Sequence, residues 1–348
     1  MILVTGATGF LGIHLLKHLV STNENKSIRA LYRSEEKLAY AKKNFFRLNN
    51  DTDQATIAWE NIEWYQTDIT DLPNLSIAFN SIKTVYHCAG MISFLKDDFL
   101  KLKKVNIEGT TNVVNLCLEH GVKKLCHVSS VATLNVSIGQ SILNETSEWN
   151  NELDNSGYAI SKHGAEMEVW RGIQEGLKAV IVNPSVILGK GFYNSGSGEL
   201  FHKIKKGIPF YTPGGTGYVG VDDVCKIMIK LTRQDINNER FVVSAENKDY
   251  LSVINSIAPL INAKKTNRLA PRYITQLIAN TESLLAKFSN YSPRIPKDIV
   301  NSLYSISEYD SSKVKQQLNY EFTPFSKVIQ EIAEDFNKSY PHSTSYIN

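Results

Sequence analysis

Cysteine is scarce in this sequence, and its spacing excludes several classes of protein. The 348 residues include four cysteines, at positions Cys88, Cys117, Cys126 and Cys225. No two of them stand at the short separation of a zinc site or a CxxC redox motif. A small secreted domain held by disulfides needs a denser framework, so we expect reduced thiols in a cytoplasmic protein. The sequence also lacks an HExxH motif and any histidine cluster linked to carboxylates, and no metal site is predicted.

Long apolar runs are absent as well. No stretch approaches the roughly 20 apolar residues that a membrane-spanning helix needs. The first predicted strand already begins at Ile2, which leaves no room for a signal peptide. We therefore expect no membrane partner.

Charge of one sign is not in excess. The chain carries 38 lysines and arginines against 35 aspartates and glutamates, a net charge of +3. The lysines are scattered in short pairs rather than gathered in a stripe, so we expect no nucleic-acid partner. A content of 42% hydrophobic and 21% charged residues is ordinary for a soluble globular protein. The length allows one large or two coupled domains.

What the sequence does contain is an alternation of apolar strands and helical segments. Such an alternation predicts βαβ units with right-handed crossovers, and hence a doubly wound, Rossmann-type α/β fold with a parallel sheet. Strands that are apolar throughout are typical of a sheet buried on both faces. We expect strands at residues 2–5, 28–32, 62–66, 84–87, 124–129 and 178–182, and helices at 11–20, 35–47, 98–120, 158–173, 273–288, 296–305 and 324–340.

Three glycines follow the first strand, in the run from Thr5 to Gly12. A helix N-terminus offers N–H groups to a phosphate, and glycine lets the backbone approach it closely. The spacing of Gly6, Gly9 and Gly12 is GxxGxxG rather than GxGxxG, and an incidental glycine-rich turn is the alternative. The strand before and the apolar helix after favour a dinucleotide-binding turn. This turn also contains Thr8, Phe10 and Leu11.

Arg33 bears on which dinucleotide binds. In NAD-binding folds an acid about 20 residues beyond the glycines holds the ribose. Here the second strand ends in Arg33 and Ser34. A guanidinium is always charged and forms two bonds, which suits the 2′-phosphate of NADP. NADP(H) is therefore favoured, with NAD(H) as the alternative if Arg33 is only an exposed residue at a strand end.

Two further strand ends are candidates for cofactor contacts. Asp68, followed by Ile69, would accept a hydrogen bond from the adenine amino group, although a helix-cap role explains it nearly as well. The fourth strand ends in the small residues Cys88, Ala89 and Gly90, where a backbone can pass close to a cofactor.

Tyr158 and Lys162 stand four residues apart in the run Tyr-Ala-Ile-Ser-Lys. On a helix such residues share one face. A free tyrosine has a pKa of about 10, and a neighbouring cation lowers it, which makes the phenol a suitable proton donor for a carbonyl. A surface pair on a helix is the ordinary explanation of this spacing taken alone.

Ser130 would complete the site. Val128, Ser129 and Ser130 end the apolar fifth strand, and ligands of open α/β sheets bind beyond the carboxyl ends of the strands. A hydroxyl at Ser130 would bind the substrate oxygen and orient Tyr158. The alternative is that both serines only satisfy local backbone groups.

Together these motifs resemble the extended short-chain dehydrogenase/reductase family, also described as epimerase/dehydratase-like, and most of all its dihydroflavonol-reductase and 3β-hydroxysteroid-dehydrogenase-like branch. The resemblance runs from Ile2 to Tyr320 and includes Val105 to Thr110 and Asn183 to Val186. It implies a Ser130, Tyr158 and Lys162 triad. It also implies cofactor contacts from Gly6, Thr8, Gly9, Phe10, Leu11, Gly12, Arg33, Asp68, Ile69, Cys88, Ala89, Gly90, Val128, Tyr158, Lys162, Pro184 and Val186.

The sequence departs from the family pattern in two places. Nucleotide-sugar dehydratases usually place two acids after the catalytic serine or threonine, and here Val131 and Ala132 follow Ser130. This speaks against a dehydratase but does not exclude an epimerase. Asn183 stands where many members carry arginine before the proline, and the sequence does not say what that change does.

Composition changes after Pro184, where glycine and proline become dense and loops are expected. We expect a dinucleotide-binding domain at 1–184, with returning segments around 217–245, and a mainly substrate-binding region at 185–340.

The sequence therefore predicts an NADP(H)-dependent oxidoreductase that transfers a hydride reversibly to a carbonyl or alcohol carbon of a small molecule. An NAD-dependent nucleotide-sugar epimerase and a non-catalytic dinucleotide sensor are the alternatives. The family resemblance implies a homodimer formed through the long helices near 98–120 and 158–175.

Overall fold

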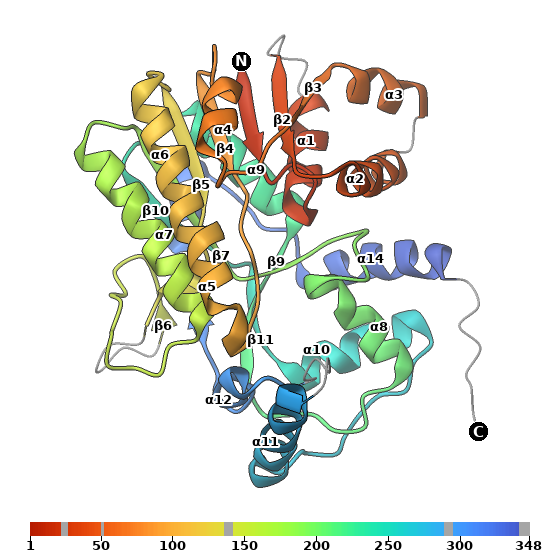
Figure 1. Cartoon of the computed structure of the whole chain (residues 1–348). Coiled ribbons are helices and arrows are strands. Elements are labelled where there is room, and N and C mark those ends of the chain that lie inside the picture. Colours follow the sequence, from red (N-terminus) through yellow and green to blue (C-terminus); the bar gives the residue numbers. More distant parts are fainter. Residues whose placement is uncertain (22–26, 50–51, 136–141, 289–294, 341–348) are drawn as a thin grey trace. The chain divides into compact units, whose positions relative to one another are not determined.

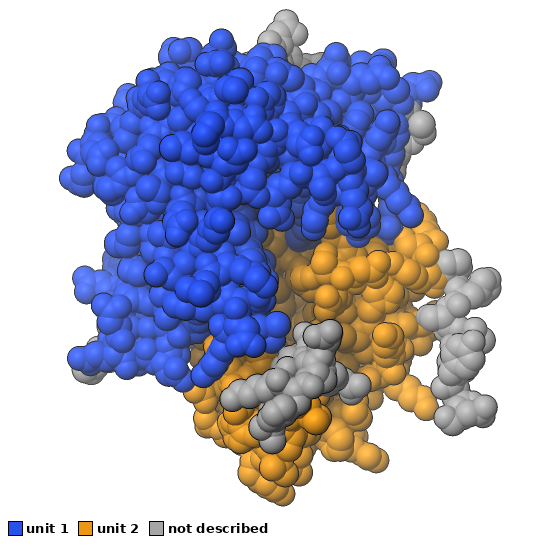
Figure 2. All heavy atoms as spheres, in the orientation of Figure 1, with its two compact units in different colours: residues 1–185, 221–244, 308–321 blue, residues 186–220, 245–307, 322–348 orange. Residues whose placement is uncertain are grey.

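The computed structural model describes residues 1–21, 27–49, 52–135, 142–288 and 295–340. Residues 289–294, which belong to the expected substrate-binding region, lie outside the described part. The chain forms two compact units, coloured separately in Figure 2. Unit 1 comprises residues 1–185, 221–244 and 308–321, and unit 2 comprises residues 186–220, 245–307 and 322–348. Each unit is thus built from three separate stretches of chain.

Unit 1 is organised around a parallel sheet of seven strands, in the order β10-β7-β5-β4-β1-β2-β3 (Figure 1). Every neighbouring pair in this order is parallel. The strands are β1 Ile2–Thr5, β2 Ile28–Tyr32, β3 Ile62–Gln66, β4 Thr84–His87, β5 Lys124–Val128, β7 Ala179–Pro184 and β10 Glu239–Val243. The strand order reverses between β1 and β4, so their carboxyl ends form the edge where such sheets bind ligands. The predicted doubly wound Rossmann-type fold is confirmed.

Helices cover both faces of this sheet. Right-handed crossovers from β1 to β2 and from β4 to β5 run in opposite directions, which places α1 and α6 on opposite faces. Helix α9 packs beside α1, and α7 packs beside α6. The helices of unit 1 are α1 Phe10–Ser21, α2 Glu35–Leu48, α3 Thr52–Glu60, α4 Leu72–Ala78, α5 Phe99–Leu102, α6 Gly109–Glu119, α7 Gly157–Gln174, α9 Val221–Arg233 and α13 Ser312–Leu318. A short parallel pair, β6 Ile142–Leu143 and β12 Glu308–Tyr309, forms a separate sheet of its own.

The long helix expected at 98–120 is interrupted. Its central turn, Lys103–Glu108, is a π-helix between α5 and α6. Asn106 in this turn is buried, and its side chain accepts from Met91 N at 2.7 Å and donates to Met91 O at 3.0 Å and to Ser161 Oγ at 2.9 Å. The wide turn therefore ties the segment after β4 to α7. Such bulges are frequent at functional sites.

Unit 2 has a small mixed sheet and an aromatic core. Strand β9 pairs in parallel with β8 and antiparallel with β11. Tyr193, Phe201, Tyr218, Phe325 and Phe336 are buried together in its core. The elements are β8 Val186–Leu188, β9 Gly215–Gly220, β11 Glu246–Asp249, α8 Glu199–Lys206, α10 Tyr250–Ile257, α11 Arg272–Phe288, α12 Val300–Leu303 and α14 Phe325–Ser339. No helix in the described ranges combines the length and the apolar character needed to cross a membrane.

Candidate active site

The glycine turn joins β1 to α1 and lies against the end of β4. Gly6 has a φ of +65°, and a Cβ at this position would lie 2.6 Å from Ala89 N. A Cβ at Gly12 would lie 2.2 Å from Gly6 O. These two glycines are therefore required by the local packing. Gly9 is exposed and its Cβ would meet only Gly6 O, at 3.2 Å, so its missing side chain leaves the start of α1 open on the outside.

Replacing Gly12 with alanine should therefore destabilise unit 1. The added methyl group would overlap the Gly6 carbonyl and Ala7 Cα, so the turn must shift, at a cost of about 1–3 kcal/mol. Thermal unfolding would measure this as a lower midpoint. Gly121→Asn is the matched control, because no atom lies within 4 Å of its Cβ position and asparagine tolerates the positive φ found there. Equal midpoints for the Gly12 variant and the wild type would contradict the packing argument.

A buried histidine connects β1, β4 and the π-helical turn. Thr110 donates to Asn106 O at 2.5 Å, so its oxygen accepts from His87 Nε2 at 3.0 Å. His87 Nδ1 is then the acceptor for the hydroxyl of Thr5, at 2.7 Å. Burial, together with the charge of Lys162, lowers the pKa of His87 to about 3, which keeps the ring neutral. This chain of hydrogen bonds fixes the carboxyl ends of both strands.

Arg33 and Asp68 lie beside each other at the ends of β2 and β3. Arg33 Nη1 is 3.7 Å from Asp68 Oδ2, and the side chains are 59% and 36% exposed. The other carboxylate oxygen accepts from the Thr70 amide and hydroxyl, both at 2.8 Å. An exposed ion pair of this kind contributes little to stability, so the guanidinium is available to a bound anion. Ile69 is buried against Gly109, where a Cβ would lie 2.5 Å from it.

Tyr158 lies in the first turn of α7, next to the end of β5. Ser156 caps this helix by accepting from Ala159 N, and the Phe94 ring meets the Tyr158 ring edge to face at 5.6 Å. Burial raises the pKa of Tyr158 above its usual value, and a side-chain hydrogen bond with Ser130 acts in the opposite direction. The phenol and the Ser130 hydroxyl are therefore neighbours.

Lys162 lies one turn further along α7 and is buried. Its ammonium donates to Val128 O at 2.7 Å, and it lies 3.9 Å from where a Cβ on Gly90 would be. Burial lowers the pKa of Lys162 to about 8, while Glu166 and Cys88 act to raise it. The effect of Lys162 on the pKa of Tyr158 stays a prediction.

The two serines after β5 have different surroundings. Ser129 is buried and donates to Glu166 Oε2 at 2.6 Å. Ser130 caps the following turn by accepting from Ala132 N at 3.1 Å, and its hydroxyl also meets Tyr158. The sequence did not reveal the role of Glu166, although its position four residues after Lys162, on the same helix face, is a signal that spacing alone could have provided.

Most of the predicted site residues lie at one edge of the sheet in unit 1. The glycine turn contacts Ala89, and Gly90 in turn lies close to Lys162, so both predicted motifs lie next to the segment that follows β4. Pro184 ends β7 in unit 1, whereas Val186 begins β8 in unit 2. The others are Thr8, Phe10 and Leu11 at the start of α1, and Cys88 directly after β4.

The residues present suit a phosphate-bearing dinucleotide. The first turn of α1 directs backbone N–H groups to an open surface beside Gly9. The exposed guanidinium of Arg33 is a second donor for an anion. Within the described residues, nothing bonds the buried hydroxyl of Ser185, directly after Pro184. A bound polar group would satisfy it. No group of three or more histidine, cysteine or acidic side chains suited to a metal ion occurs in the described part of the chain.

Comparisons with known proteins indicate the family of the chain. A family model of NAD-binding proteins, described as Male sterility protein, matches residues 4–210. The chain is 25% identical over 341 residues to a putative dihydroflavonol 4-reductase of Synechocystis sp., which covers 95% of this chain and 92% of that protein. It is 27% identical over 267 residues to a decarboxylating sterol-4-alpha-carboxylate 3-dehydrogenase of Candida albicans, covering 72% and 71% of the two chains.

Among solved structures, the chain is similar to the UDP-glucose 4-epimerase of Thermus thermophilus in complex with NAD. The TM-score is 0.70, at 20% identity, over 97% of this chain and 98% of that one. At this level of identity the similarity concerns the fold.

Proposed function

Because the chain belongs to the NAD-binding family described as Male sterility protein, and with it to the extended short-chain dehydrogenases/reductases, we propose that it is an NADP(H)-dependent oxidoreductase acting on a carbonyl or alcohol carbon of a small molecule. This proposal rests on one observation, the proximity of Tyr158, Ser130 and Lys162 at the carboxyl end of β5. A phenol that is hydrogen-bonded to Ser130 stands one helical turn from a buried ammonium.

In the reductive direction each of these residues has a separate role in the protonation of a carbonyl oxygen. The Ser130 hydroxyl donates a hydrogen bond to that oxygen and holds it next to Tyr158. The Tyr158 hydroxyl then transfers its proton to the oxygen, which leaves a phenolate. The Lys162 ammonium stabilises that negative charge. A bound reduced nicotinamide would supply the hydride.

Further residues would bind and orient the dinucleotide. The backbone of the glycine turn would hold the pyrophosphate at the start of α1. Asp68 and Ile69 would flank the adenine. The small residues Cys88, Ala89 and Gly90 are not buried and would let their backbone pass close to the cofactor. Pro184, at the end of β7, would line the nicotinamide. The Lys162 ammonium would also bond the nicotinamide ribose.

Arg33 is the proposed reason for a preference for NADP(H). Arg33→Asp should reverse this preference, because a carboxylate repels the 2′-phosphate but accepts hydrogen bonds from a free ribose hydroxyl. Equilibrium binding of NADP and of NAD to both proteins would measure the change, which we expect to exceed tenfold in the affinity ratio, or about 1.4 kcal/mol. Lys37→Asp, in the first turns of α2, is the control for the change of net charge. An unchanged ratio in the Arg33 variant would exclude this role.

The proposed activity is tested by following NADPH oxidation with a panel of ketones and aldehydes. The names of the two relatives favour flavonoid-like and sterol-like carbonyl compounds for the panel. Net consumption of NADPH supports the oxidoreductase. Interconversion of a UDP-sugar with tightly held NAD and no net NADPH consumption would favour the epimerase, and cofactor binding without any turnover would favour a sensor. The homodimer stays a prediction, which light scattering would test.

A further inference from the structure

A fully buried glutamate lies one turn beyond Lys162 on α7. Both oxygens of the Glu166 carboxylate accept hydrogen bonds from side chains of unit 1, which fixes the carboxylate in one position and offsets the cost of burying it. Oε2 accepts from Ser129 Oγ at 2.6 Å, Asn183 Nδ2 at 2.9 Å and Thr133 Oγ1 at 3.1 Å, and Oε1 accepts from Arg240 Nη1 at 3.2 Å and Trp170 Nε1 at 3.4 Å.

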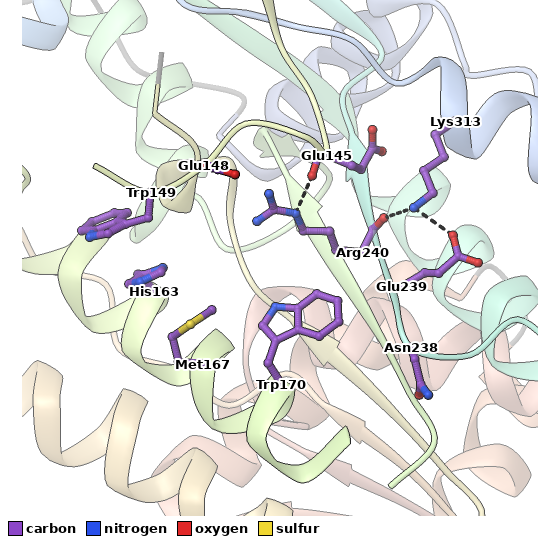
Figure 3. Close-up of a pocket in the computed structure, with 10 residues that line it drawn as sticks. All are labelled: Glu145, Glu148, Trp149, His163, Met167, Trp170, Asn238, Glu239, Arg240 and Lys313. Carbon is purple, nitrogen blue, oxygen red and sulfur yellow. Dashed lines mark hydrogen bonds and ion pairs between the residues drawn. The ribbon is translucent and has the colours of Figure 1, made fainter. Parts of the chain in front are cut away.

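Arg240 reaches this carboxylate from β10, at the edge of the sheet. Its guanidinium also donates to Glu145 O at 2.9 Å and to Ser147 O at 2.6 Å. Figure 3 shows Arg240 between its strand and the segment that carries Glu145 and Trp149. The side chain is 18% exposed. One guanidinium therefore ties three parts of unit 1 together: β10, the 145–147 segment and α7.

Asn183 links the carboxylate to the backbone of Ser130. It is completely buried at the end of β7, and its Nδ2 lies 3.2 Å from Ser130 O as well as 2.9 Å from Glu166 Oε2. Ser129, the residue before Ser130, bonds the same oxygen directly. The Ser130 segment is thus held on two sides by groups that converge on Glu166.

We propose that Glu166 is a positioning residue of the active site: together with Arg240 and Asn183 it holds Ser130 in place for Tyr158, and it places a negative charge one helical turn from Lys162. It acts without touching substrate or cofactor. The inference rests on the proposed roles of Ser130, Tyr158 and Lys162. It also gives a role to Asn183, because the guanidinium that reaches Glu166 comes from β10 and not from the position before Pro184.

The charge of Glu166 acts on Lys162 in a defined direction. Burial favours the neutral amine, and Glu166 favours the ammonium. The charge of Lys162 also acts on Cys88 directly after β4, on the neutral ring of His87 on β4 and on His127 on β5, and Tyr158 lies on its own helix. Glu166 is the one carboxylate among these groups, and its negative charge favours the ammonium form of Lys162. Removing its charge should therefore make Lys162 lose its proton at lower pH.

The first test replaces the carboxylate by an amide of the same size. Glu166→Gln should lower kcat by about 10- to 100-fold, because a small displacement of a reacting group costs on the order of 100-fold in rate. The KM for NADPH should change by less than about twofold, since the side chains that bond Glu166 belong to none of the proposed cofactor-binding residues. Glu168→Gln is the matched control, because this residue lies on the same helix but pairs with Arg171 on the surface. An unchanged kcat in a variant with wild-type circular dichroism would overturn the proposal.

The second test asks whether Arg240 works through Glu166. Arg240→Met should lower kcat by a similar factor, and the Glu166→Gln/Arg240→Met double variant should lose no more than either single variant. Fully additive losses would show that Arg240 acts independently and would overturn its part in the proposal. Arg240→Lys keeps the positive charge but lacks the planar set of N–H donors of the guanidinium. This variant should fold readily and lose less activity than Arg240→Met.

The third test needs no catalytic activity. The rate of acetylation of Lys162, followed by mass spectrometry as a function of pH, reports when its ammonium deprotonates. Its midpoint should move to lower pH in Glu166→Gln and stay in place in Glu168→Gln. An unmoved midpoint in Glu166→Gln would overturn the proposal. If the wild type reduces no carbonyl compound, the proposed function fails while this measurement still decides the role of Glu166.

Discussion

Tyr158→Phe is expected to lower turnover by about 100- to 10,000-fold, because the loss of a positioned general acid removes a rate factor of that size. The variant loses only the hydroxyl, and the edge-to-face contact of the ring with Phe94 remains. The affinity for the dinucleotide should stay close to that of the wild type. NADPH oxidation at saturating carbonyl compound measures the first quantity, and fluorescence titration with NADPH measures the second.

Tyr65→Phe is the matched control for this experiment. It also removes a phenolic hydroxyl that makes a hydrogen bond, to Asn74 at 2.9 Å, but on β3 rather than in the candidate site. It should leave turnover unchanged. Retention of wild-type turnover by the Tyr158 variant would exclude this phenol as the proton donor. It would favour the Ser130 hydroxyl as the proton donor instead.

Lys162→Met should have an effect of nearly the same size. It keeps a long apolar stem inside unit 1 but removes the ammonium that stabilises the phenolate, which should lower kcat by about 100- to 1,000-fold. It should also raise the KM for NADPH, because the same group would bond the nicotinamide ribose. Steady-state kinetics with both substrates varied would measure the two effects. An unchanged KM for NADPH would remove the ribose contact, and an unchanged kcat would remove the electrostatic role.

The pH dependence of the wild type follows from the same lysine. Burial lowers the pKa of Lys162 to about 8, so the ammonium is present below that pH and is lost as the pH rises through it. The raised pKa of Tyr158 keeps the phenol protonated over this range. The rate of reduction should therefore fall as the pH rises through about 8. The residual activity of Lys162→Met should not show this decrease.

Stability should move in the opposite sense to activity. In the unfolded chain a lysine has a pKa of about 10.4, so between the two values the unfolded state binds more protons and Lys162 makes folding more favourable as the pH rises. Below a pH of about 8 the buried ammonium opposes folding. The melting temperature of Lys162→Met at neutral pH should thus be no lower than that of the wild type.

Local patterns in the sequence were sufficient to predict much of unit 1. Strands β1 to β4 have the bounds that the sequence predicted for them, residues 2–5, 28–32, 62–66 and 84–87. The family resemblance is confirmed, and so is the doubly wound sheet. These features depend on neighbours along the chain, which is why periodicity and turn residues reveal them.

Other features depend on residues that are far apart in the sequence. The π-helical turn around Asn106 is stabilised by Met91 and Ser161. The helical periodicity of the apolar residues in this segment does not predict such a turn. No strand was predicted around Arg240, and its guanidinium reaches Glu166 because β10 pairs with β7. Asn183 was recognised as a departure from the family pattern, but its role could be assigned only when its three acceptors were known.

The assembly of unit 1 from three stretches of chain has a consequence for its biosynthesis. Strand β10, at the edge of the seven-stranded sheet, comes from residues 239–243, and the last stretch of the unit is residues 308–321. During synthesis one edge of β7 therefore stays unpaired until more than fifty further residues have been made and β10 can pair with it. Exposed strand edges invite pairing with other chains. A fragment that stops at residue 185 would keep the glycine turn and the proposed catalytic residues and yet lack the strand that protects that edge.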